Sequence, residues 1–182
     1  MSGKSTLLKS FGLLAYLSRI GFSVPAESAS LPFYESIFVM ISHNDDLQSG
    51  YSHFMSEIMN LKQVLLQAKN GGTCLAIFDE LFKGTNIEDA VKISTATLSG
   101  INQYANTLFF ISTHLQQLAE MDINHQQKIN TVYLDCNIVD NFPVFNFKLK
   151  EGWSQQKVGQ LLFEKEGLFE LLKPKSQSNS IN

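Results

Sequence analysis

Three stretches of the chain carry apolar residues at every third or fourth position, which is the spacing of helices with one buried face. The predicted helices cover residues 5–20, 52–69 and 87–104. Gly21 follows the first stretch and Asn70-Gly71-Gly72 follows the second, and glycine is common just past a helix end. Asn86 precedes the third stretch, where its side chain can cap the first turn.

Short apolar runs alternate with these helices and are predicted to form buried strands. The runs are Ser36–Ile41, Thr73–Phe78 and Thr107–Ile111. The middle run is apolar at nearly every position, which is typical of a central parallel strand with helices on both faces. The alternation of helix and strand predicts an α/β fold, with a mainly parallel sheet flanked by helices.

Beyond residue 129 the hydrophobic period changes to every second residue. Two alternating stretches, 129–139 and 143–150, lie on either side of Asp140-Asn141 and predict a C-terminal antiparallel hairpin. A helix over 156–163 is expected to follow. The polar residues 173–182 are expected to form a disordered tail.

The composition is that of a folded globular domain, with 44% hydrophobic and 17% charged residues. We expect one domain over residues 1–172 of the 182. The net charge of −3 provides no general attraction for nucleic acid or an anionic membrane. No apolar run reaches the roughly eighteen residues that span a bilayer, and Cys74 and Cys136 lack metal-type spacing. These features predict a cytoplasmic protein with free thiols and no membrane partner.

The first six residues, Met-Ser-Gly-Lys-Ser-Thr, match the second half of the phosphate-binding loop G-x-x-x-x-G-K-[ST]. In such a loop Gly3 lets backbone N–H groups approach phosphate oxygens, Lys4 supplies a cation and Ser5 offers a hydroxyl to Mg²⁺. The sequence contains neither the first half of the motif nor the strand before it. The half-motif alone is equally consistent with an ordinary solvated chain start.

Two of the predicted strands end in residues that can take part in phosphate chemistry. Asp79 can hold Mg²⁺ through water, and Glu80 can polarise a water that attacks the γ-phosphate. His114, after Ser112-Thr113, can hydrogen-bond that phosphate. Paired acids also occur by chance after apolar runs, and a lone histidine is more often a solvated turn residue. The order of the three motifs is the order found in ABC-type ATPases.

From Met1 to about Leu168 the chain resembles the ATPase domain of MutS proteins. The matching segments are Met1–Thr6, Ile20–Ala26, Asp45–Glu57, Asp79–Glu80 with Gly84–Asn86, and Ser112–His114. The most specific is Asp45–Glu57, similar to the family signature Asp-Asp-Leu-x-x-Gly-x-Ser-Thr-Phe-Met-x-Glu. The chain departs from the family pattern at Ser42-His43, His53, Phe82-Lys83 and Asn86, which indicates a divergent branch.

The resemblance implies a P-loop NTPase of the ABC type that binds ATP and Mg²⁺. It assigns cofactor binding to Gly3, Lys4, Ser5, Thr6 and, from the partner subunit, Ser52; magnesium to Ser5 and Asp79; and catalysis to Glu80 and His114. The family pairs two ATPase domains head to tail, so we expect a homodimer through the ATPase face. Ser52 can also be a plain helix N-cap, and both roles are compatible.

The implied function is an ATP-binding and hydrolysing module of a MutS-like DNA repair or recombination protein, in which ATP-driven conformational change of the dimer is coupled to DNA binding. DNA would be held by domains outside this sequence, an expectation that rests on family analogy. The alternative is a non-catalytic fold or dimerisation module, because half a phosphate loop cannot enclose a triphosphate. We expect Met1 to lie within the loop of a longer protein, after a cut or a misassigned start.

Overall fold

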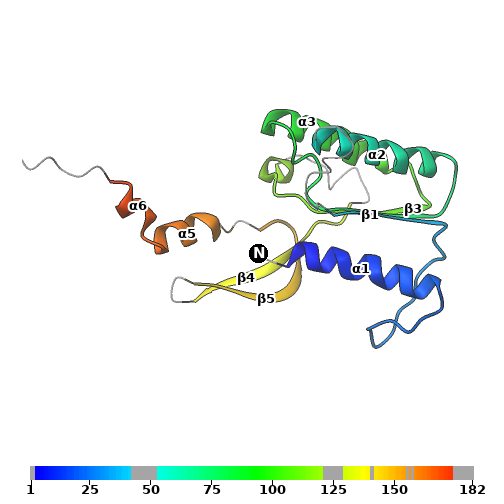
Figure 1. Cartoon of the computed structure of the whole chain (residues 1–182), viewed down its shortest axis with the longest axis horizontal. Coiled ribbons are helices and arrows are strands. Elements are labelled where there is room, and N and C mark those ends of the chain that lie inside the picture. Colours follow the sequence, from blue (N-terminus) through cyan, green and yellow to red (C-terminus); the bar gives the residue numbers. More distant parts are fainter. Residues whose placement is uncertain are drawn as a thin grey trace, which may run out of the picture. The chain divides into compact units, whose positions relative to one another are not determined.

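The computed structural model describes residues 3–41, 53–120, 129–139, 142–154, 156 and 158–173. The chain divides into two compact units, of which the first runs from Gly3 to Thr131 and the second begins at Val132 (Figure 1). In the described residues no helix is both long and apolar enough to span a bilayer.

The first unit is built on a parallel sheet whose strand order follows the chain. Its strands are β1 (Ser36–Met40), β2 (Cys74–Phe78) and β3 (Thr107–Ile111). The three strands end level with one another: Met40 lies opposite Phe78, and Phe78 lies opposite Ile111. The carboxyl ends of the strands therefore share one edge. All five residues of β2 are buried, as expected for a central strand covered on both faces.

Helices cover the two faces of this sheet (Figure 1). The helix α1 (Lys4–Arg19) lies on one face, and α2 (His53–Lys69) and α3 (Ile87–Ile101) lie on the other. A short 3₁₀ helix, η1 (Gln116–Ala119), follows β3. The predicted α/β fold with a parallel sheet is therefore confirmed.

Contacts between α1 and the sheet form the core on that face. Leu8 and Ala15 of α1 belong to one buried cluster with Leu75 and Ile77 of β2. A Cβ atom at Gly12 would stand 3.0 Å from the Val39 side chain. The absence of a side chain at Gly12 therefore lets α1 approach β1 closely.

The second unit contains the predicted antiparallel hairpin, formed by β4 (Val132–Val139) and β5 (Phe142–Glu151). The register shifts between Leu134 and Cys136. There the buried Asp135 accepts a hydrogen bond of 2.6 Å from Asn146 and pairs with Lys150 at 2.9 Å. These two partners, Lys150 first, lower the pKa of Asp135.

Element boundaries differ slightly from those predicted. The third helix ends at Ile101 because the chain turns there toward β3, with the Tyr104 N–H donating to the Ile101 carbonyl. The C-terminal helix, α5 (Val158–Lys165), is followed by an unpredicted single turn, α6 (Leu168–Leu171). The tail predicted from residue 173 lies outside the described residues from 174 onward.

Candidate functional site

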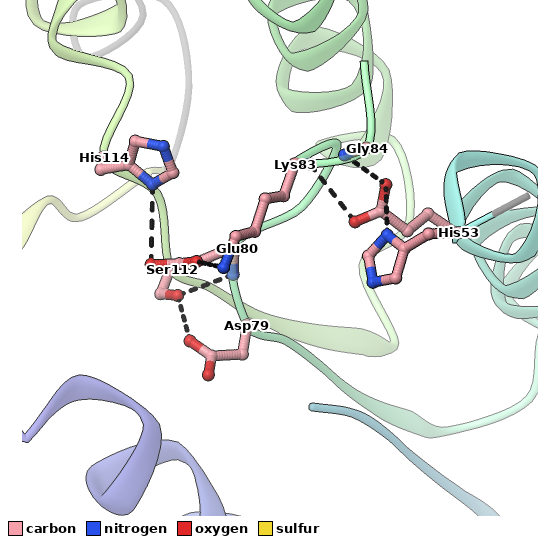
Figure 2. Close-up of polar contacts among 8 residues, drawn as sticks. His53, Asp79, Glu80, Lys83, Gly84, Ser112 and His114 are labelled. Carbon is pink, nitrogen blue, oxygen red and sulfur yellow. Dashed lines mark hydrogen bonds and ion pairs between the residues drawn. The ribbon is translucent and has the colours of Figure 1, made fainter. Parts of the chain in front are cut away.

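Polar side chains meet at the carboxyl edge of the sheet, where β2 and β3 end (Figure 2). The Ser112 hydroxyl donates to Oδ1 of Asp79 at 2.6 Å and accepts the backbone N–H of Glu80 at 2.9 Å. One buried hydroxyl thus fixes both acidic residues relative to β3. No role was assigned to Ser112 from the sequence, although its place after an apolar strand is the signal that could have identified it.

The carboxylate of Glu80 lies between the side chains of Lys83 and His114 (Figure 2). Its Oε2 is 2.9 Å from Nζ of Lys83, and its Oε1 is 3.6 Å from Nδ1 of His114. The hydrogen bond from Lys83 is the main cause that lowers the pKa of Glu80, and partial burial opposes it. The charges of Lys83, His114 and Lys4 lower this pKa further. Lys4, at the start of α1, is therefore close enough to Glu80 to act on it electrostatically.

The loop after β2 has an unusual backbone. Glu80 and Phe82 have φ angles of 58° and 64°, in the left-handed region that non-glycine residues seldom adopt. Each such residue costs on the order of 1–3 kcal/mol and persists only where its surroundings hold it, often at functional sites. Phe82 is 1% exposed and packs edge-to-face on Phe54, with 6.3 Å between ring centroids. Packing against α2 therefore holds the loop that carries Glu80.

The first turn of α1 is open to an anion. Gly3, its N-cap, has a φ of 89°, which glycine adopts without strain, and no side chain caps the helix. The first N–H groups of a helix have no partner within the helix and favour negative charge. Lys4 is half-buried, whereas Ser5 and Thr6 are exposed. This end of α1 can therefore present N–H groups, hydroxyls and a cation to a phosphate.

A small hollow lies beside the Glu80 carboxylate. Its lining includes Glu80, Lys83, Thr113 and His114, and its volume is about 90 Å³. Small-molecule pockets typically measure roughly 300–1,000 Å³. The hollow can hold water next to Glu80, but a nucleotide would have to lie outside it.

The structure brings together four of the residues singled out from the sequence: Lys4, Asp79, Glu80 and His114. Ser52 lies outside the described residues, so its role stays a prediction. The contact between Lys83 and Glu80 was not anticipated, although a basic residue three positions after an acid in a loop is a possible ion pair.

The donor set of this edge suits a magnesium-bound phosphate. Magnesium prefers oxygen ligands and commonly takes one or two carboxylates together with substrate phosphates. The half-buried carboxylate of Asp79 uses Oδ1 for the Ser112 hydroxyl, and the exposed Ser5 carries a further oxygen. These oxygens, with Lys4, match the chemistry that such a group requires.

Comparison with known proteins identifies relatives of the chain. The family described as MutS domain V matches residues 1–171. The DNA mismatch repair protein MutS of Streptococcus sanguinis is 31% identical over 180 residues, which is 98% of this chain and 21% of that protein. The MutS proteins of Bacillus pumilus and Lactococcus lactis are 31% and 32% identical over 87% of the chain, which is 18% and 19% of theirs.

The chain thus spans about a fifth of the length of the curated relatives it matches. The match extends over all of the first unit and over the hairpin and helices of the second. It includes every residue of the polar edge described above. The chain belongs to the MutS family, of which it carries domain V.

Proposed function

We propose that this chain is the ATP-binding and hydrolysing module of a MutS-like DNA repair or recombination protein. The observation that carries the proposal is the meeting of Asp79, Glu80 and His114 at one edge of a parallel sheet, with Lys4 near enough for its charge to lower the pKa of Glu80. In open α/β sheets ligands bind at the carboxyl ends of the strands. Membership of the MutS family supports the same assignment.

The start of α1 is proposed to hold the phosphates. The N–H groups after Gly3 would face phosphate oxygens, Lys4 would neutralise their charge, and Ser5 and Thr6 would add hydroxyl contacts. Ser5 and Asp79 would hold magnesium, which when bound draws charge from the phosphates. His114, whose side chain is 58% exposed, would reach the terminal phosphate.

Glu80 is proposed to orient the attacking water. The water oxygen bonds to the γ-phosphorus, the bond from that phosphorus to the β–γ bridging oxygen breaks, and ADP and phosphate leave with the water proton passing to phosphate. A glutamate is ionised at neutral pH, and the lowered pKa of Glu80 reinforces this, so its carboxylate would accept a hydrogen bond from water and align it. Catalysis of this kind is mainly positional and electrostatic.

We also propose a fold type, a dimer arrangement and a link to DNA. The proposed fold is of the ABC ATPase type, and we interpret the departures from the family pattern, among them His53 and Lys83, as those of a divergent branch. Two copies pair head to tail, so that Ser52 of one copy meets the nucleotide of the other. DNA is bound by other domains of a longer protein, and ATP-driven closure of the dimer changes that binding.

The test compares ATP–Mg²⁺ binding and hydrolysis by this chain and by a version extended upstream to complete the loop motif. We expect the extended chain to bind and hydrolyse ATP, and Lys4→Met in it to abolish binding. If the extended chain neither binds nor hydrolyses ATP–Mg²⁺, the chain is instead a non-catalytic fold or dimerisation module. The exposed Lys92 provides the matched control as Lys92→Met, which should bind ATP normally.

The role of Glu80 has its own test in the extended chain. We expect Glu80→Gln to retain ATP binding, because it keeps the size of the side chain, and to lose turnover by a factor of about 10²–10³. The dimer formed with ATP should last longer in this variant. Binding is measured by titration calorimetry and turnover by phosphate release. Unchanged hydrolysis would remove Glu80 from this role.

A further inference from the structure

The side chain of Glu57, in the second turn of α2, binds the loop that carries Glu80. Its two carboxylate oxygens accept the backbone N–H groups of Lys83 and Gly84, each at 3.3 Å (Figure 2). The Glu57 side chain is only 14% exposed. His53, one turn earlier on α2, lies 3.8 Å from the same carboxylate. One carboxylate therefore ties two adjacent peptide groups of the loop to a helix that is distant in sequence.

The loop also contacts the backbone of α2 directly. A Cβ atom at Gly84 would stand 2.8 Å from the backbone nitrogen of Phe54 and 3.0 Å from its Cα. Real Cβ atoms do not approach backbone so closely, so the loop can lie here only because residue 84 is glycine. The ring of Phe54 in turn packs on Phe82. Hydrogen bonds and close packing thus hold the same short segment.

We propose that Glu57 is a positioning residue for the hydrolytic site. Holding the peptide groups of Lys83 and Gly84 fixes where the Lys83 side chain begins, and its ammonium group is 2.9 Å from Glu80. Glu57 on α2 thereby holds the loop backbone, the loop backbone positions Lys83, and Lys83 positions the Glu80 carboxylate that is proposed to orient water. The catalytic meaning of this placement rests on the proposed ATPase function.

A carboxylate suits this position better than an uncharged side chain. Hydrogen bonds from N–H groups to an ionised acceptor are stronger than those between neutral groups, and two oxygens can serve two adjacent donors. Glutamine at residue 57 offers a single acceptor oxygen, and alanine offers none. Replacement of Glu57 first by glutamine and then by alanine should therefore loosen the loop in graded steps.

The first experiment needs no nucleotide. Amide hydrogen exchange of Lys83 and Gly84 is measured in the unmodified chain and in Glu57→Gln, Glu57→Ala and Glu164→Gln, the last an exposed control on α5. We expect exchange at these two amides to rise about tenfold or more in Glu57→Ala, to rise less in Glu57→Gln, and to stay unchanged in the control. Exchange in β2 should be unaffected. Unchanged exchange at both amides would overturn the proposal.

The second experiment measures turnover in the extended chain. We expect Glu57→Ala to lower kcat about 10- to 100-fold with ATP affinity within about twofold, and Glu57→Gln to recover part of the loss. Gly84→Ala adds a Cβ atom that collides with the Phe54 backbone and pushes the loop away from α2. This variant should also lower kcat while leaving ATP affinity nearly unchanged. The control is Gly100→Ala, where an added Cβ meets nothing within 4 Å. Weakened ATP binding with normal kcat would contradict the positioning role.

The two experiments separate failure of this proposal from failure of the ATPase function. Amide exchange reports the contact between Glu57 and the loop whether or not ATP is hydrolysed. If the unsubstituted extended chain lacks turnover, the ATPase function fails, and the exchange data still decide whether Glu57 holds the loop. If turnover is present and independent of Glu57, only the positioning role fails.

Discussion

At the scale of single residues, the ion pair between Lys83 and Glu80 determines which chemical role suits the Glu80 carboxylate. Lys83 occupies Oε2 of Glu80 at 2.9 Å, and the pKa of Glu80 falls mainly through this hydrogen bond. A carboxylate with a lowered pKa is a weaker base, so it orients water better than it removes a proton from it. The same interaction raises the pKa of Lys83.

These pKa shifts predict how stability responds to pH when Lys83 is replaced by methionine. The Glu80 pKa is lowered by folding, so its contribution is present above the unfolded value of about 4.3 and is lost as pH falls through the folded value. At pH 7 we expect Lys83→Met to be less stable than the parent by at most about 1 kcal/mol, because the pair is partly exposed. Near pH 2 the difference should vanish.

Urea unfolding at a series of pH values measures this difference in free energy. The Lys83 pKa is raised, so the contribution also declines at alkaline pH, as that amine loses its proton. Lys92→Met removes an exposed lysine of α3 and serves as the control, with no pH-dependent difference expected. A difference that persisted at pH 2 would show that Lys83 stabilises the fold through packing and not through its charge.

At the scale of elements, the strands at the centre of the sheet were the most predictable part. Both faces of β2 are covered, so all of residues 74–78 are apolar and form a continuous apolar run in the sequence. The loop after β2 was not predictable in the same way. Its left-handed residues are Glu80 and Phe82, where no glycine signals the turn.

The contacts of the candidate site also divide into those that could be predicted from the sequence and those that could not. The acidic pair after β2 and the histidine after β3 could be identified, since parallel strands that end in register bring their following residues to one edge. The interaction of Glu57 with Lys83 and Gly84 could not be identified, because it joins segments 26 and 27 positions apart through backbone donors. Backbone N–H groups carry no residue-specific signal.

The buried strand β2 predicts a large stability loss on truncation. Ile77 is 0% exposed and belongs to the cluster that α1 packs against, so Ile77→Ala removes apolar contacts and leaves a cavity. We expect the free energy of unfolding to fall by about 2–5 kcal/mol in urea denaturation. Leu13→Ala on α1, where the side chain is 53% exposed, should cost less than about 1 kcal/mol. Equal losses in the two variants would contradict the assignment of β2 to the core.

At the scale of the whole molecule, the proposed site requires more than one copy of the chain. The cis groups gather at the start of α1 and after β2 and β3, whereas Ser52 is proposed to act on the nucleotide of the partner. Lys4→Met and Ser52→Ala should therefore each abolish turnover alone in the extended chain. Mixing them should restore about a quarter of the activity, because half of randomly paired dimers are mixed and each mixed dimer has one intact site.

A second mixture distinguishes active sites that are built from two chains from a general stabilisation of one variant by pairing with another. Lys4→Met and Glu80→Gln both alter groups that act within their own chain, so a mixed dimer of these two variants has a defect in each site. No recovery is expected from that mixture, although its chains exchange and pair as freely as those of the first. Phosphate release measured for both mixtures under the same conditions decides the matter. Recovery in neither mixture, with exchange of chains verified, would contradict the role of Ser52 across the dimer, because only a site built from two chains can be repaired by supplying each half separately.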